Sequence, residues 1–289
     1  MNSRPHRRRL TPLLLAVLFS GTVPRAAFTQ DRAYFVTYDH YLEERGNLEI
    51  AVASTSGLPK HDRPSYTAPW IELEYGITGW WTGELYLEGV AVNGQGSAFT
   101  GWRWESRFRP LTTERLINPV IYVEFEDITE ASRIQKEIVG RGPLPAAPLD
   151  ELRDEHAREL EAKLILSSAV RGWNISENVI VEKNLSEDEG LEFGYSVGAS
   201  RALGGLASGA PCRLCRENFV VGVEAYGGLG DSNDFGLADT RHFIAPVMAW
   251  HFSDRMTIKA SAAFGLTDAS DGYLLRFGWA YEFPLGGRR

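Results

Sequence analysis

The sequence predicts an all-β fold: a closed, antiparallel, up-and-down transmembrane β-barrel of about 12 strands, preceded by a cleaved signal peptide. Three observations lead to this prediction. Apolar and polar residues alternate with a period of two through most of residues 48–283. The connections between the alternating segments sort by length. The first 27 residues have the pattern of an export signal.

Composition narrows the possible classes of protein. The 289 residues are 44% apolar, 24% charged and 11% aromatic, with a formal net charge of −8. This is too apolar and too aromatic for a disordered chain. The acidic balance, without a basic face, argues against a nucleic-acid partner. Because no run of about 20 apolar residues follows the N-terminus, a helical membrane protein is excluded.

The N-terminus reads as an export signal. Arg4 and Arg7–Arg9 form a basic region, Leu10–Phe19 is a short apolar core, and small residues follow at Ala26 and Ala27. We therefore expect residues 1–27 to be a signal peptide and the compartment to be oxidising. Residues 28–47 are then expected to form an N-terminal periplasmic segment, 48–283 the barrel, and 284–289 a C-terminal tail.

Two cysteines, Cys212 and Cys215, form a C-x-x-C pair. A structural zinc site needs four ligands, and no histidine follows the pair as haem attachment requires. The pattern favours a local disulfide, with a redox or metal role as the alternative, and no metal or cofactor is predicted.

The period-two alternation is clearest in the last segment, where Tyr273, Leu275, Phe277 and Trp279 share one face and Arg276 and Glu282 share the other. Because side chains alternate across a strand, this gives one apolar and one polar wall. The same pattern recurs in segments centred on 48–54, 66–76, 80–91, 98–109, 118–128, 158–169, 173–184, 190–201, 217–229, 242–252, 256–265 and 273–283.

Connection lengths support a membrane barrel. Those after even-numbered segments are mostly short, whereas those after odd-numbered segments are longer and polar, and the longest is an external loop at 127–157. Transmembrane barrels have short periplasmic turns and longer external loops. The connections 110–118 and 202–216 are exceptions, being long on the side predicted to be periplasmic.

Alternation alone does not say which face is wet, because a small soluble barrel alternates with its apolar face inward. Two features favour the reverse orientation. Aromatic residues such as Tyr75, Trp104 and Phe283 lie near the ends of the apolar faces, as in interfacial girdles. The segments are also about ten residues long, the length that a tilted membrane strand needs. An exported soluble β-protein is the lesser alternative.

Residues 39–50, with Asp39-His40-Tyr41-Leu42-Glu43-Glu44 and Asn47-Leu48-Glu49-Ile50, and residues 69–78, with the run Pro-Trp-Ile-Glu-Leu-Glu-Tyr-Gly-Ile-Thr, resemble one family. It is the phenol-degradation meta-pathway (MetA-type) family of outer-membrane proteins. The resemblance implies a transport barrel in the cell outer membrane, and its motifs are alternation and turns rather than catalytic signatures. The chain departs from many such barrels because Pro284–Arg289 follows the aromatic Phe283.

In a membrane barrel the polar faces line the lumen. The candidate lumen-lining residues are Glu72, Glu74, Glu84, Glu88, Arg103, Glu105, Arg107, Arg109, Glu124, Glu126, Glu161, Lys163, Glu224, Arg276 and Glu282. Acids outnumber bases among them, so a hydrated lumen would favour cations. The arginine ladder 103/107/109 either binds an anionic substrate or pairs with acids such as Glu88 and Glu124 on neighbouring strands, and we favour the pairing.

No compact catalytic motif is present. G-x-S-x-G and H-E-x-x-H are absent, and His251 near Ser253 is the best local pair. We therefore predict a monomeric, non-enzymatic outer-membrane barrel that passes small solutes through an acidic lumen. The alternative is a plugged structural or adhesive barrel, with loop 127–157 folded inward, whose long loops bind a partner. The expected partners are the outer-membrane bilayer, the barrel-assembly machinery and a small solute.

Overall fold

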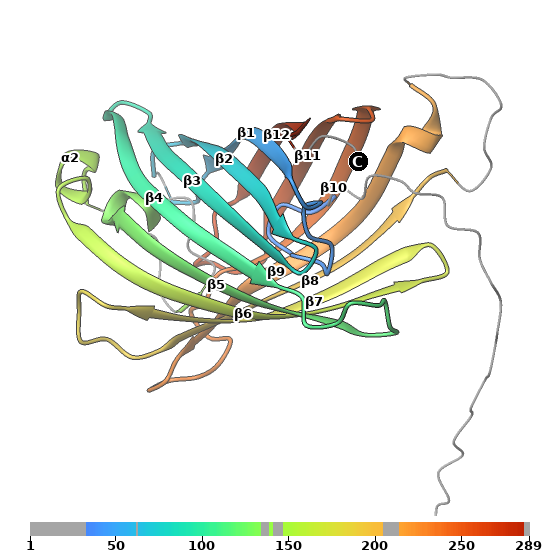
Figure 1. The fold of residues 1–289 in the computed structure, drawn as a ribbon. Helices are drawn as coiled ribbons and strands as arrows, with labels where there is room; N and C mark the ends of the chain where they lie inside the picture. Colours follow the sequence, from blue (N-terminus) through green and yellow to red (C-terminus); the bar gives the residue numbers. More distant parts are fainter. Residues whose placement is uncertain (1–32, 62, 134–138, 141–146, 205–213, 286–289) are drawn as a thin grey trace, which may run out of the picture.

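The structure, a computed structural model, describes residues 33–61, 63–133, 139–140, 147–204 and 214–285. In these residues, strands that are consecutive in sequence pair antiparallel, and β1 pairs with β12 to close a barrel (Figure 1). The strands are β1 (Asn47–Leu58), β2 (Tyr66–Thr78), β3 (Trp81–Val92), β4 (Gly96–Phe108), β5 (Asn118–Thr129), β6 (His156–Val170), β7 (Trp173–Asn184), β8 (Glu192–Ala202), β9 (Phe219–Asp231), β10 (His242–Ser253), β11 (Met256–Gly265) and β12 (Tyr273–Pro284).

All the predicted segments are strands, which confirms the predicted fold class. Their ends agree to within four residues, the largest difference being the extension of the first segment to Leu58. The closure is complete along its seam, because every residue of β1 has a partner on β12, from Asn47 opposite Pro284 to Leu58 opposite Tyr273. A closed barrel leaves no unpaired strand edge.

The apolar faces point outward. Val52, Ile71, Leu164 and Phe277 are between 43% and 54% exposed on the outside of the barrel. Glutamates and arginines on the alternate positions of the strands are buried inside it. A soluble barrel would have the reverse arrangement. The exterior is therefore suited to lipid, as the sequence predicts.

The two ends of the barrel differ in their connections. At the end where β1 begins and β12 ends, here called the terminus end, β2–β3, β6–β7 and β10–β11 are joined by two residues each. Arg171 and Gly172 in the β6–β7 turn both have positive φ, 52° and 80°. This is the type I′ geometry that suits the twist of a hairpin, and glycine adopts it without strain. The opposite end, here called the loop end, carries the long β5–β6 connection, residues 130–155.

Two short helical pieces lie in the β5–β6 connection: the 3-10 turn η1 (Glu130–Ser132) and the single helical turn α2 (Leu149–Leu152). A second 3-10 turn, η2 (Arg216–Asn218), precedes β9. Within the described residues, helices long and apolar enough to cross a membrane are absent. The predicted signal peptide 1–27 lies outside the described residues, as do residues 286–289 of the predicted tail.

Leu164 tests the orientation of the faces, because it lies midway along β6 and is 47% exposed. We expect Leu164→Arg to destabilise the barrel in lipid by about 2–4 kcal/mol, the cost of a lipid-facing arginine near the bilayer midplane. Leu185→Arg is the matched control. Leu185 is 53% exposed and follows the last residue of β7, so its replacement should cost about 0–1 kcal/mol near the interface. Equal urea midpoints for the two variants in vesicles would contradict the outward assignment.

Candidate functional site

The candidate site is the charged interior of the barrel. Except for Arg109, which follows the last residue of β4, the candidate lumen-lining residues lie on the inward-facing positions of their strands. Eleven of them are buried: Glu74, Glu84, Glu88, Glu105, Arg107, Glu124, Glu126, Glu161, Lys163, Glu224 and Arg276. Glu72, Arg103, Arg109 and Glu282 are partly buried. The strict alternation of strands places these side chains on one surface although they come from seven strands.

Arg107 on β4 is the centre of the largest ion-pair cluster. It is fully buried and pairs with Glu74 on β2, Glu84 on β3 and Glu105 on its own strand, the last with Nε and Oε1 2.9 Å apart. A buried charge is tolerated only when it is paired or hydrated. The guanidinium therefore stabilises three carboxylates that would otherwise repel one another, and it ties three adjacent strands together.

A second cluster surrounds Arg103, four residues from Arg107 along β4. Its guanidinium pairs with Glu88 on β3 (2.6 Å) and Glu124 on β5 (3.1 Å), and it lies over the ring of Tyr86. Tyr122 donates a hydrogen bond to Glu124 (2.8 Å). Of the two interpretations of the arginine ladder, the structure shows ion pairs with acids for Arg103 and Arg107. Arg109, the third arginine, donates to the carbonyl of Gly79.

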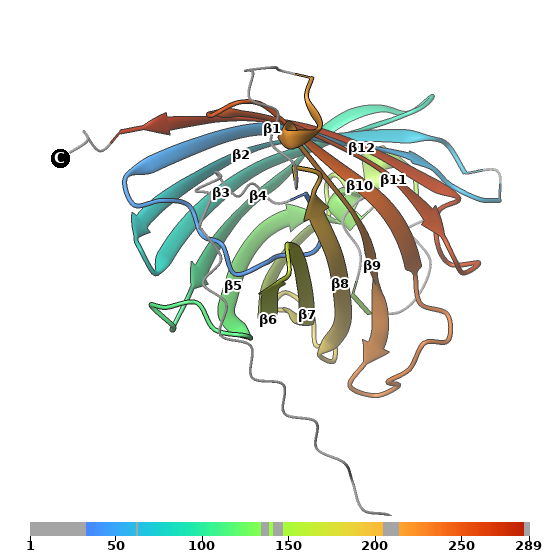
Figure 2. The ribbon, with the colours of Figure 1, turned by 90° about the vertical axis from the view of Figure 1, so that its right-hand side faces the viewer.

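Residues 33–46, here called the N-terminal strap, lie inside the barrel. Figure 2 shows this segment crossing the interior before it turns into β1. Ala33, Tyr34, Thr37 and His40 are at most 3% exposed. The sequence predicted a periplasmic segment at 28–47. The described part of that range is instead packed inside the barrel, because its polar groups form hydrogen bonds with inward-facing side chains of the wall.

Glu224 on β9 holds the strap by its backbone. The carboxylate accepts hydrogen bonds from three consecutive N–H groups, those of Phe35 (3.3 Å), Val36 (3.0 Å) and Thr37 (3.0 Å). Its other neighbour is Arg276 on β12, with a nitrogen–oxygen distance of 3.9 Å. Backbone donors bound to a carboxylate make strong hydrogen bonds at a buried position. Glu224 therefore acts as a fixed anchor for the strap.

The β6–β7 wall adds a second set of bonds to the strap. The side-chain amide of Asn178 accepts from the Tyr38 N–H (2.7 Å) and donates to the Tyr38 carbonyl (2.9 Å), as a neighbouring strand would. His40 Nδ1 lies 2.8 Å from the Ser167 hydroxyl. On β8, Gly198 leaves room for the ring of Tyr34, since a Cβ there would lie 2.6 Å from a ring carbon.

Between the strap and the wall formed by β1, β2, β11 and β12 there is a cavity of about 320 Å³. Its acidic lining residues are Glu43, Glu44, Glu49, Glu72, Glu74, Glu88, Glu161 and Glu282, and its basic ones are Arg103, Lys163, Lys259 and Arg276. Acids thus outnumber bases two to one around this cavity.

At the loop end the interior is apolar. Leu149 and Leu152 of α2 and Ala131 of η1 pack in one buried cluster with inward-facing residues such as Tyr66 and Phe243. The Leu149 N–H also donates to the Gln95 side chain (2.8 Å). The described parts of the predicted external loop 127–157 therefore fold against the inner wall and narrow the loop end.

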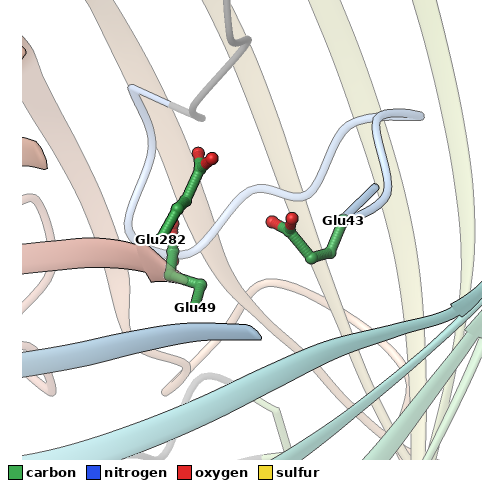
Figure 3. A group of neighbouring side chains, drawn as sticks. All are labelled: Glu43, Glu49 and Glu282. Carbon is green, nitrogen blue, oxygen red and sulfur yellow. The ribbon is translucent and has the colours of Figure 1, made fainter. Parts of the chain in front are cut away.

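Three carboxylates meet where the strap joins the barrel wall. Glu43 on the strap, Glu49 on β1 and Glu282 on β12 bring carboxylate oxygens within 4.8 Å of one another (Figure 3). Burial, together with the charges of Glu74 and Glu282, raises the pKa of Glu43 from 4.5 to about 8. Glu43 is therefore largely protonated below pH 8, which lets the three side chains stay together.

The pKa of His40, also on the strap, is shifted in the opposite sense. Burial, together with the charge of Arg109, lowers the pKa of His40 from 6.5 to about 4. The ring is therefore neutral at pH 7. Glu114, from the β4–β5 connection, lies 3.8 Å from His40 Nε2.

Other chemistry-bearing groups have structural partners. Glu124, Glu126 and Glu161 bring oxygens within 4.8 Å, a spacing that a divalent cation could use, but Lys163 lies 2.8 Å from Glu161 and supplies positive charge. We assign no metal to them. His251, singled out near Ser253, lies 3.2 Å from the Thr257 hydroxyl. Cys212 lies outside the described residues, so its predicted disulfide with Cys215 stays a prediction.

Sequence reasoning did not find the strap or its anchors. Residues 33–46 have no periodicity, and Asn174, Ser176 and Asn178 read only as polar positions of an irregular strand. The role of Glu43 was also missed, because an isolated acid outside a strand has no local signal.

Comparison with solved structures finds the same fold in an outer-membrane channel from Pseudomonas putida F1, with a TM-score of 0.57 and 10% identity over 85% of this chain and 98% of that one. The KdgM porin in complex with disordered oligogalacturonate (TM-score 0.48, 5% identity, 82% and 99% of the two chains) and the NanC porin (0.47, 11%, 81% and 98%) also match. No protein-family model matches the chain, and no curated protein matches its sequence.

The class of protein follows from the closed barrel, its apolar exterior and the fold that it shares with the Pseudomonas putida channel. The chain is a β-barrel of the bacterial outer membrane, closed by twelve antiparallel strands in its described residues. At 10% identity the likeness to the Pseudomonas putida channel establishes the fold.

Arg107 should be essential for stability. We expect Arg107→Met to cost about 3–5 kcal/mol of unfolding free energy, because three buried carboxylates lose their counter-ion. Adding Glu84→Gln and Glu105→Gln should restore part of the loss. Arg109→Met is the matched control just beyond the end of β4, and its effect should stay below about 1 kcal/mol because the hydrogen bond from Arg109 to the Gly79 carbonyl is exposed. Denaturant titration in vesicles measures all these differences, and equal losses at positions 107 and 109 would contradict the assigned role.

Proposed function

We propose that the protein is a passive outer-membrane channel for small solutes and that its interior favours cations. The observation that carries this proposal is the 320 Å³ cavity inside the barrel, lined by twice as many acids as bases. Charged rings along a pore concentrate counter-ions and exclude co-ions. The solute is proposed by charge class only.

The loop pattern supports an orientation for the channel. The first strand begins and the last strand ends at the terminus end, where three of the connections have two residues. Such barrels have short turns on the periplasmic side. We therefore place the terminus end, and the attachment of the strap to β1, toward the periplasm.

The family relation is part of the same proposal. The residues that resemble the phenol-degradation meta-pathway (MetA-type) proteins, 39–50 and 69–78, form the end of the strap, the start of β1 and most of β2. These segments are adjacent in the structure, since β1 pairs with β2. The residues that carry the resemblance would thus be those that connect the strap to the first two strands of the barrel.

A second candidate function has support of its own. The strap and the apolar cluster of α2 both occupy the interior, which favours a plugged structural or adhesive barrel whose loops bind a partner. We propose no enzymatic activity, because Ser167 beside His40 is fully buried and also accepts a hydrogen bond from Ser176.

Reconstitution in a planar bilayer separates the two candidates. Discrete conductance steps in KCl, with a reversal potential of cationic sign across a salt gradient, are expected of the channel. A folded, heat-modifiable protein without conductance between pH 5 and 9 would favour the plugged barrel.

Glu72 and Glu282 test the acidic lining. Both border the cavity from opposite sides of the β1 strand. We expect Glu72→Gln combined with Glu282→Gln to move the reversal potential toward zero while the barrel stays folded, because two negative charges leave the pore wall. The control is Glu151→Gln with Glu155→Gln, two exposed acids in the β5–β6 connection, which should leave the reversal potential unchanged. Identical selectivity in the two double variants would exclude the cavity as the selectivity site.

A further inference from the structure

The N-terminal strap is attached to the barrel in two different ways. Its first half is anchored by neutral or backbone donors to Glu224, Asn178 and Ser167 on β9, β7 and β6. Its second half meets the β1–β12 seam through Glu43, whose carboxylate oxygens come within 4.8 Å of those of Glu49 and Glu282 (Figure 3). The first attachment does not use the Glu43 carboxyl, whereas the second is weakened when all three carboxylates carry charge, and the strap is held in place by the two attachments together.

We propose that the strap is a proton-operated closure of the channel: charging of Glu43 beside Glu49 and Glu282 releases the strap from the barrel interior. This inference rests on the proposed channel function only for its consequence, the opening of a pore. The strap can be released whether or not the barrel conducts.

The groups around Glu43 determine the direction of the effect. They are Asn47 and Glu49 on β1, Glu74 on β2, Glu282 on β12 and the adjacent Glu44. Among the described residues, Asn47 is the one whose side chain lowers the pKa of Glu43 through a hydrogen bond. The bases lining the same cavity are Arg103, Lys163, Lys259 and Arg276. Arg103 pairs with Glu88 and Glu124, and Lys163 pairs with Glu161. Arg276 lies 3.9 Å from Glu224. The charges that act on Glu43 are those of Glu74 and Glu282, and both oppose its ionisation.

His40 titrates in the opposite sense and limits the pH range. In the closed state its pKa is about 4 and that of Glu43 about 8, and in the released state they return toward 6.5 and 4.5. Between pH 4.5 and 6.5 the closed state keeps a proton on Glu43 and the released state keeps one on His40, so the two effects cancel. Between pH 6.5 and 8 only Glu43 differs, and the closed state binds one proton more.

The difference in bound protons gives the sign and the size of the pH dependence of strap release. A state that binds an extra proton loses stability as the pH rises, by a factor of about ten per pH unit for one proton. The ratio of released to closed strap should thus increase about thirtyfold between pH 6.5 and 8, the window set by the two pKa values. Below pH 6.5 the strap should stay in place.

The movement can be followed without conductance. Thr37 is 2% exposed, and its N–H bonds to Glu224, so a cysteine at this position is protected while the strap is in place. The variant is Thr37→Cys in the full chain with Cys212→Ser and Cys215→Ser, folded in liposomes and treated with a water-soluble maleimide between pH 5 and 8.5. Rates are compared with the same protein carrying Glu43→Gln, because this ratio removes the pH dependence of the thiol itself.

We expect labelling relative to the Glu43→Gln protein to rise about thirtyfold from pH 6.5 to 8, and open probability of the otherwise unaltered chain to rise with it. Glu44→Gln, which removes the neighbouring exposed acid, should keep the rise. In the rates before division by the Glu43→Gln rates, His40→Gln should extend the rise downward toward pH 4.5, because the compensating titration is lost. These two variants distinguish a specific role of Glu43 from a general loss of negative charge.

Each proposal fails separately. Labelling that ignores pH, or that depends equally on pH with and without the Glu43 carboxyl, overturns strap release even if the barrel conducts. Labelling that rises as expected in a barrel without conductance supports strap release and overturns the channel function.

Discussion

The antiparallel pairing of β1 with β12 is the contact on which the rest of the structure depends, because it turns a sheet with two open edges into a barrel that a bilayer can accept. Closure also creates an inside and an outside for every strand. Side chains on alternate positions then face either lipid or the interior. A shift of one residue in the strand register would exchange the two sets. The seam therefore fixes the register from which the interior chemistry follows.

An interior made of glutamates is costly unless the charges are neutralised. The barrel meets this requirement locally. Arg107 and Arg103, four residues apart on β4, each pair with acids of the neighbouring strands, and Lys163 pairs with Glu161 on β6. Around the cavity next to β1, β2 and β12, acids outnumber bases two to one. The strap borders this cavity.

The strap contacts two walls of the barrel. Its backbone donors are held by Glu224 on the far wall, while its own acid, Glu43, faces the acid-rich seam. In the proposed closure, charging of Glu43 weakens the attachment to the seam and so shifts the population of the strap toward the released position. Leu149 and Leu152, the buried residues of α2 at the loop end, are apolar.

The sequence by itself determined the class of fold, the strand boundaries and the inward position of residues such as Glu84, Arg107 and Glu224, because strand periodicity is a local property that each residue carries with it. It also indicated that Arg103 would pair with Glu88 or Glu124, since opposite charges on adjacent strands have few other partners. The position of residues 33–46 was decided only by the tertiary structure. An aperiodic segment is held by hydrogen bonds to Glu224 and Asn178, which are 140 or more residues away in sequence, and such partners are known only once the barrel has closed.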